Sequence, residues 1–195
     1  MNSTVVLTTP GWRHASQLQW FRLVAFSVGI VLGAGVVAAV AVLLSGFVTW
    51  APAVARSVAL LALVAAWVAS DLPSVRFTLP QTHRQIGREV LGRPLSGPLQ
   101  FGVELGTGVR TYMPSAGPYA LAGLLLLFPS APLAAVVAAG FGLGRSLGSW
   151  LRFLGGAERD EAARWSRLAP RRLAGLAAAV AVAVTVAGTL LGVWS

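Results

Sequence analysis

Four apolar runs of bilayer length constrain this chain more than any other feature. They occupy positions 23–48, 52–69, 131–151 and 173–194. A helix needs about 20 such residues to cross the hydrocarbon core of a bilayer, so each run predicts one transmembrane helix. Only 11% of the residues are charged, against roughly 25% in soluble domains. The predicted fold class is therefore all-α, a polytopic membrane helix bundle.

The segment 97–128 is too long for one straight crossing. As an unbroken helix it would be about 48 Å long, whereas the hydrocarbon core is about 30 Å thick. Its middle reads MPSAGP, and Pro114 and Pro118 each remove a backbone donor and clash with the preceding turn. We expect a third span over 98–128 that is broken by glycine and proline, with a second short helix beginning near Tyr119.

The positions of the arginines predict the topology. The chain contains no lysine, and with five crossings 13 of its 15 arginines fall on one side of the membrane. The short connections near residues 49–51 and 129–130, on the other side, carry none. Cytoplasmic loops collect basic residues, so we expect a cytoplasmic N-terminus and an outer C-terminus. Residues 1–195 then form a single, multi-pass transmembrane domain of the cell membrane, and four crossings would place one arginine-rich loop on the wrong side.

Several kinds of chemistry are poorly supported by this sequence. There is no cysteine, and His14 and His83 lie far apart without a carboxylate cluster, so we expect no metal site and no cofactor. No serine–histidine–acid arrangement can be assembled, and we expect no catalytic residues and no enzyme activity. The basic residues follow membrane sidedness and are not interleaved with aromatic residues, so we expect no nucleic-acid partner. The arginine-rich inner loops are instead candidates for contact with anionic lipid.

The broken segment carries the most informative polar residues. Helical periodicity places Gln100, Glu104, Thr107 and Thr111 on one face, and Gly102, Gly106 and Arg110 on another. Lipid tolerates a charge near the bilayer centre poorly, so both faces are expected to point into the bundle. The candidate binding residues are Glu104, Thr107, Arg110, Thr111, Ser115 and Arg145.

The break itself favours an anion. The second half-helix would direct its positive N-terminus toward the break, where Arg110 also lies. Glu104 and Arg145 are expected at matched depth on antiparallel helices, where they would pair and leave Arg110 uncompensated. The alternative is that Glu104, Arg110 and Arg145 form one structural network that ties two helices together.

Glycines spaced by four residues predict close helix contacts. Gly140, Gly144 and Gly148 form one such row, which we expect to be an interface. A tight contact within the chain is favoured over a dimer seam. Gly29 and Gly33 form a second pair with the same spacing.

Residues 108–147 carry a proline-broken helix followed by a glycine-rich helix with the sequence GLG. This pattern resembles one half of the CcdA/DsbD-type thiol-transporting membrane family. That family carries a cysteine just after a proline, whereas Ser115 and Ala116 occupy the corresponding places here. The resemblance therefore implies the broken-helix scaffold without the redox chemistry.

Two functions from different classes remain open. The first is a non-catalytic integral membrane subunit that packs against a larger complex through its glycine faces and inner loops, with other membrane subunits or a homo-oligomer as partners. The alternative is a small transporter or binder of an anionic solute or lipid headgroup at the broken third helix. The short connections on the outer side favour the subunit.

Overall fold

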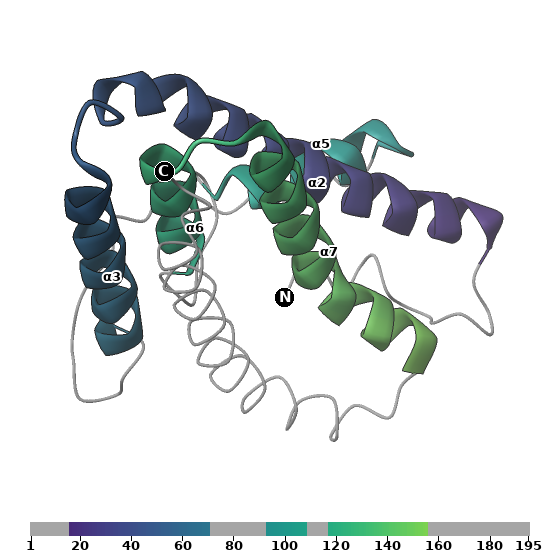
Figure 1. Cartoon of the computed structure of the whole chain (residues 1–195). Helices are drawn as coiled ribbons and strands as arrows, with labels where there is room; N and C mark the ends of the chain where they lie inside the picture. Colours follow the sequence, from purple (N-terminus) through teal and green to yellow (C-terminus); the bar gives the residue numbers. More distant parts are fainter. Residues whose placement is uncertain (1–15, 71–92, 109–116, 156–195) are drawn as a thin grey trace. The chain divides into compact units, whose positions relative to one another are not determined.

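The structure is a computed structural model that describes residues 16–70, 93–108 and 117–155. Every regular element in these residues is a helix (Figure 1). The elements are α2 (Gln17–Leu44), the 3₁₀ turn η2 (Ser45–Phe47), α3 (Ala53–Ser70), α5 (Ser96–Thr107), α6 (Gly117–Leu127) and α7 (Ala131–Gly155). The all-α class is confirmed for this part of the chain, and helices occupy four of the five predicted spans. The fifth, 173–194, lies outside the described residues.

Side-chain hydrogen bonds shape the turn between α2 and α3. The Ser45 hydroxyl donates to the Val42 carbonyl at 2.6 Å, where the α-helix tightens into η2. Trp50 Nε1 donates to the Phe47 carbonyl at 2.7 Å. Pro52 follows directly, and its carbonyl accepts the first-turn N–H of Arg56 at 3.1 Å. This turn therefore has partners for backbone carbonyls that the helix ends leave unpaired.

The third predicted span consists of two helices, and the first of them ends earlier than expected. Gly108 has φ 68°, the only left-handed residue in the described ranges, and it follows the last residue of α5. Glycine adopts this conformation without steric cost and commonly ends a helix. Within the described residues the helical polar stripe ends at Thr107, and Thr111 lies outside them. α6 begins at Gly117, with Pro118 in its first turn, close to the predicted start.

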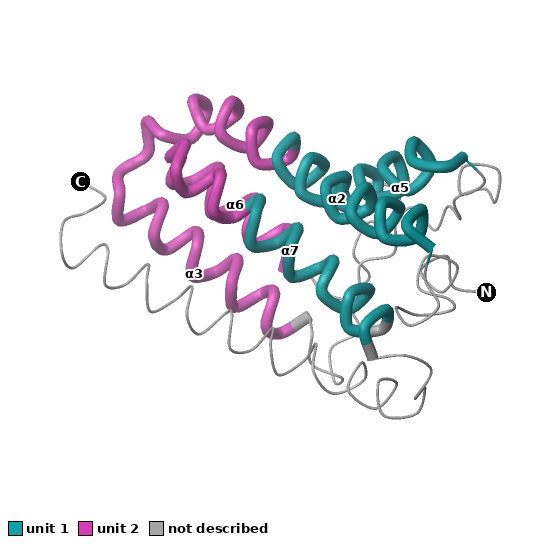
Figure 2. Tube along the Cα trace, turned by 90° about the vertical axis from the view of Figure 1, so that its right-hand side faces the viewer, with its two compact units in different colours: residues 1–36, 81–112, 138–166 teal, residues 37–80, 113–137, 167–195 magenta. Residues whose placement is uncertain are grey.

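The chain forms two compact units, which Figure 2 shows in different colours. Unit 1 contains residues Met1–Val36, Gln81–Tyr112 and Ala138–Ser166, and unit 2 contains Val37–Pro80, Met113–Val137 and Arg167–Ser195. Helices α2 and α7 contribute residues to both. Each unit is described separately below.

A crossing of four glycines joins α2 to α5 in unit 1. A Cβ added at Gly29 would lie 3.0 Å from the Cα of Gly102 and would strike the carbonyl oxygen of Leu99. Four residues further along both helices, a Cβ at Gly33 would strike the carbonyl oxygen of Val103, and a Cβ at Gly106 would lie 3.0 Å from the amide of Ala34. The contacts advance together, so α5 runs parallel to α2. Only glycine permits backbones to approach this closely.

Aromatic side chains and one hydrogen bond attach α7 to α2 in unit 1. The core contains Leu23, Phe26, Ile30, Phe101 and Phe153, all buried. Trp150 Nε1 donates to the Ser27 hydroxyl at 2.9 Å, and a Cβ at Gly142 would lie 2.8 Å from the Cα of Val31. Higher numbers on α7 therefore meet lower numbers on α2, and the two helices are antiparallel.

We expect Trp150→Phe and Ser27→Ala each to lower the free energy of unfolding in detergent by about 0.6–1.7 kcal/mol, between the average and the largest value found for hydrogen bonds between membrane helices. Both substitutions remove the same bond, so their effects should be less than additive. Denaturation by sodium dodecyl sulfate, followed by tryptophan fluorescence or gel mobility, measures both effects. Fully additive losses would show that the bond does not couple the two helices.

The core of unit 2 is formed between α3 and α6. Its buried members are Leu60, Val64, Trp67, Ala120 and Phe128. A Cβ at Gly123 would contact the end of the Leu63 side chain, and Arg56 at the start of α3 reaches Leu127 at the end of α6. The two helices are therefore antiparallel. The end of the Leu63 side chain can move away from a Cβ at Gly123, whereas the backbone atoms in the glycine crossing of unit 1 cannot. Glycine is therefore less strictly required at position 123.

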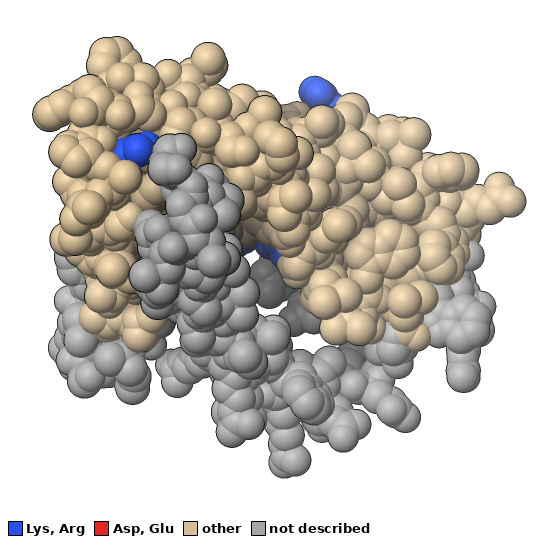
Figure 3. All heavy atoms as spheres, in the orientation of Figure 1, with Lys and Arg blue, Asp and Glu red and all other residues tan. Residues whose placement is uncertain are grey.

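Two helical runs in the described residues are long and apolar enough to cross a membrane, Gln17–Phe47 and Ala131–Leu151. Many large apolar side chains on them are exposed, among them Leu32, Val36, Leu43, Val136 and Leu151. The face drawn in Figure 3 shows few basic and no acidic atoms among the described residues. Exposed apolar surface of this kind is compatible with contact with a membrane or with another protein.

Candidate functional site

Arg145 is the most unusual charged residue of unit 1. It lies in the middle of α7 and is partly buried. Its Nε is buried and has no hydrogen-bond partner, and the guanidinium carbon lies 5.7 Å from the centre of the Phe141 ring. Phe141 precedes Arg145 by four residues, and side chains on a helix lean toward its N-terminus, which explains the contact. The ring provides a weak cation–π interaction but no hydrogen-bond acceptor for Nε.

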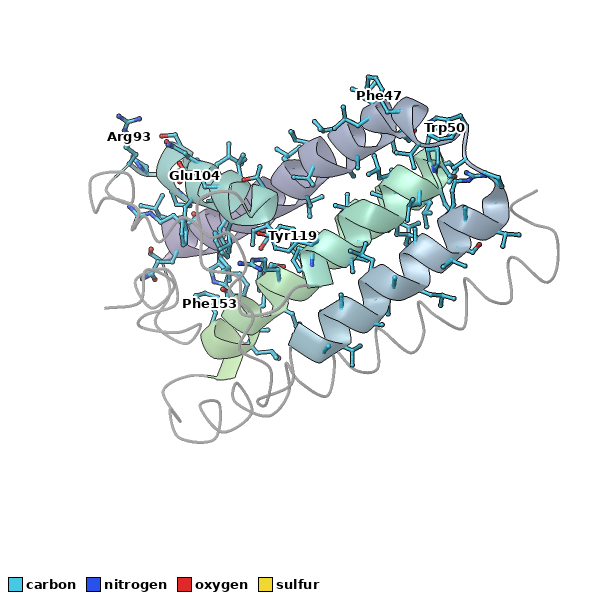
Figure 4. All side chains as sticks on the ribbon, turned by 90° about the vertical axis from the view of Figure 1, so that its left-hand side faces the viewer. Phe47, Trp50, Arg93, Glu104, Tyr119 and Phe153 are labelled. Atoms are coloured by element: carbon cyan, nitrogen blue, oxygen red, sulfur yellow. The ribbon has the colours of Figure 1, made fainter. Side chains whose placement is uncertain are left out.

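Two hydrogen bonds link described polar residues of α5. Gln100 Nε2 donates to Glu104 Oε1 at 3.1 Å, and the Thr107 hydroxyl donates to the Glu104 carbonyl at 3.1 Å. Glu104 is half-buried, and Figure 4 shows it on α5 together with Arg93, which precedes this helix. Gln100 is exposed, so the polar face does not point fully into the bundle as we expected. The glycine face packs on α2 instead, because only that face permits close approach.

The expected partnership between Glu104 and Arg145 is not formed. Within the residues that the structure describes, no ion pair joins them, and Arg145 contacts Phe141 instead. The other three candidate binding residues, Arg110, Thr111 and Ser115, lie outside the described ranges. Of the proposed set, Glu104 and Thr107 are brought together by α5.

The row of Gly140, Gly144 and Gly148 faces away from the described part of the chain. No described atom lies within 4 Å of the position that a Cβ would take at any of the three. Gly142, which the sequence analysis did not single out, makes the close contact with α2. An interface at the three-glycine row thus stays a prediction, and it would involve something other than the described residues of α2 or α5.

Arg56 is a residue that the sequence analysis missed. It lies in the first turn of α3, where its Nη1 donates to the Leu127 carbonyl at 3.0 Å and its guanidinium carbon lies 5.3 Å from the centre of the Phe128 ring. Leu127 is the last residue of α6, so the cation occupies the negative end of that helix dipole. The sequence did contain a sign of its importance, because Arg56 is an arginine within a predicted span and outside the arginine-rich loops.

The described residues contain no cluster of three or more histidine, cysteine, aspartate or glutamate side chains that could hold a metal ion. What they do contain is two arginines, Arg56 and Arg145, each with a buried Nε that has no acceptor, one carboxylate bonded to an amide, and a row of glycines. This combination is suited to binding an anionic group and to close packing of helices.

No protein-family model, curated protein or solved structure matches this chain. The likeness of residues 108–147 to the CcdA/DsbD-type family therefore remains one of glycine and proline spacing.

Proposed function

We propose that this protein is a five-span integral membrane protein whose third span is broken. The directions of the helices support this topology. If segment 98–128 entered and left on the same side, α7 would cross in the same direction as α2, whereas Ser27 meets Trp150 and Val31 meets Gly142 in antiparallel order. Likewise α5 runs parallel to α2 and α6 antiparallel to α3. One broken crossing accounts for all three relations.

Aromatic residues at the two ends of α2 agree with a membrane-spanning position. Trp20 lies near its start, and Phe47 and Trp50 follow its end with 78% and 82% of their surfaces exposed (Figure 4). Trp20 and Phe47 are about 40 Å apart along a helix, close to the thickness of a bilayer with its headgroup regions. Exposed aromatic side chains at both levels are typical of membrane interfaces.

A reporter that is active only outside the cytoplasm tests this topology. Fused after Ser130, between α6 and α7, it should be active. The chain would have crossed the membrane three times by this point, which places this connection on the outer side, as the arginines predict. Fused at Ser96, before α5, it should be inactive, and a cytoplasmic reporter should show the reverse pattern at both positions. Activity of the outer reporter at both sites would exclude a crossing by residues 98–128.

Within this topology we infer a non-catalytic subunit of a larger membrane complex. The open row of Gly140, Gly144 and Gly148 carries this inference. Contact with lipid tails does not require such a row. Contact with another helix does, because small residues let the two backbones approach closely. The exposed flanks of α7, with Leu143 and Leu147, extend the same apolar face.

Purification from native membranes in a mild detergent tests the subunit. The chain has a mass of 20.2 kDa, and we expect a larger particle in which a second membrane protein is present in constant ratio. A particle that contains only this chain would favour the second candidate, binding or transport of an anionic solute or lipid headgroup at the broken span. The unpaired Nε of Arg145 is the observation that favours this candidate.

A further inference from the structure

Two arginines of unit 1 lie where the start of α2 meets the segment before α5. Arg22 Nε donates to the Pro94 carbonyl at 3.1 Å, and Arg93 directly precedes Pro94 in the chain. The bond engages one nitrogen of the Arg22 guanidinium and holds this group beside the backbone that carries Arg93. Two cations from distant parts of the sequence are thus attached at neighbouring points of the structure.

The described residues supply no anion to these two arginines. Within the described ranges, the bond to Pro94 is the single hydrogen bond or ion pair that either arginine forms. The first turns of α2 and α5 contain no acid. Glu104 is the single acid in these ranges, and its carboxylate accepts a hydrogen bond from Gln100 on the same helix. Arg93 is exposed and extends away from α5 in Figure 4.

The neighbours of Arg22 place it at the edge of an apolar surface. Trp20 and Phe21 precede it and are exposed, and the exposed residues that follow on α2 include Val24 and Val28. An arginine at such an edge lays its aliphatic stem on the apolar surface and keeps its guanidinium at the level of the lipid headgroups, where tryptophan is also enriched. The proposed topology assigns this level to the cytoplasmic leaflet, which is the one that carries anionic lipid.

We propose that Arg22 and Arg93 together bind the phosphate of one anionic phospholipid in the inner leaflet. The choice of leaflet rests on the topology proposed above, whereas the two arginines are brought together by unit 1 alone. A guanidinium binds phosphate through paired hydrogen bonds. The acyl chains of the same lipid would lie along Val24 and Val28, a contact that a free phosphate ion cannot make. A zwitterionic headgroup brings its own cation toward the arginines, so an anionic headgroup is favoured.

The test measures lipid binding to the full chain in detergent by native mass spectrometry. The protein is titrated with phosphatidylglycerol and, in parallel, with phosphatidylcholine of the same acyl chains. We expect one phosphatidylglycerol per chain to bind more tightly than phosphatidylcholine. Arg22→Gln and Arg93→Gln should each weaken its binding about fivefold, which corresponds to the contribution of one arginine near an anionic membrane surface. Arg22→Lys should weaken it less, because it keeps the charge but not the planar fork.

Arg56→Gln is the matched control for loss of a positive charge. Arg56 lies on α3, where its guanidinium already donates to the Leu127 carbonyl, so this variant should keep the preference for phosphatidylglycerol. An equal loss in Arg56→Gln would overturn the proposal, as would a tightly bound phosphatidylglycerol that persists in the double variant of Arg22 and Arg93. Displacement of the lipid by inorganic phosphate at equal concentration would also overturn it, because the acyl chains would then contribute nothing.

Two further outcomes separate the lipid site from the proposed function. If a second membrane protein copurifies with the chain and is released by the double variant, a protein surface occupies the two arginines and the lipid site is refuted, while the subunit function stands. If the tight phosphatidylglycerol depends on both arginines but the reporters at Ser96 and Ser130 show the reverse pattern, the lipid site stands and the topology is refuted.

Discussion

Gly29→Ala should destabilise the protein by about 1–3 kcal/mol, the usual cost of overpacking, and toward the upper end of that range. The new methyl group would strike the carbonyl oxygen of Leu99 and lie 3.0 Å from the Cα of Gly102, and neither backbone atom can rotate away as a side chain could. The helices α2 and α5 must therefore separate. Such a separation also weakens the stacking of Phe26 on Phe101, whose rings are 5.3 Å apart.

Gly35→Ala is the matched control on the same helix. No described atom lies within 4 Å of its Cβ position, so the free energy of unfolding should not fall, and the higher helix propensity of alanine should raise it slightly. Denaturation in mixed micelles measures both variants. Gly102→Ala should resemble Gly29→Ala, and the double variant should lose less than the sum because one separation relieves both clashes. Equal losses for Gly29→Ala and Gly35→Ala would mean that the parallel crossing does not exist.

Arg56→Gln should cost about 2–3 kcal/mol of unfolding free energy. It removes a hydrogen bond from a charged donor to the Leu127 carbonyl, and it leaves that acceptor at the end of α6 without its partner. It also removes the cation from the ring of Phe128. Arg56→Lys should recover part of the loss, because it keeps the charge at the helix end but not the planar face that lies over the ring.

Arg93→Gln provides the control for loss of an arginine. Arg93 is exposed before α5, so this substitution should change the unfolding free energy by no more than about 0.5 kcal/mol. Both variants are compared by thermal unfolding in the same detergent at the same ionic strength. A loss for Arg93→Gln as large as that for Arg56→Gln would show that Arg56 acts through net charge and not through its contacts with α6.

The positions of the helices followed from hydrophobic runs, because burial in lipid demands a long apolar stretch wherever it occurs in the chain. The described helices overlap four of the predicted spans, and the break in 98–128 follows from helix length and from glycine and proline. Its position was less predictable. Proline marks where a helix must end, but Gly108 ended α5 before the first of these prolines, since glycine can adopt a left-handed conformation wherever the surrounding structure favours it.

Which helices pack against each other could not be predicted in the same way. Two glycine pairs and one row of three glycines have the same spacing of four residues in this sequence, and spacing alone does not tell which of these helix faces meet. The structure joins Gly29 and Gly33 to Gly102 and Gly106, while the row at Gly140, Gly144 and Gly148 stays open to the described part of the chain. Two backbones approach closely only where both helices carry small residues at the point where they cross. The sequence of one helix does not tell which helix supplies the matching residues.

For the charged residues, too, the sequence predicted one part and the packing of the helices decided another. Composition and the placement of arginine predicted a membrane protein with its loops on defined sides, because transfer of a charge into lipid is costly whatever its neighbours are. Which charges meet depends on rotation and depth, which only the packed helices decide. Among the described residues no ion pair joins Glu104 to Arg145. Arg56 lies at the end of α6, Arg145 contacts the ring of Phe141, and the buried Nε atoms of both arginines have no acceptor.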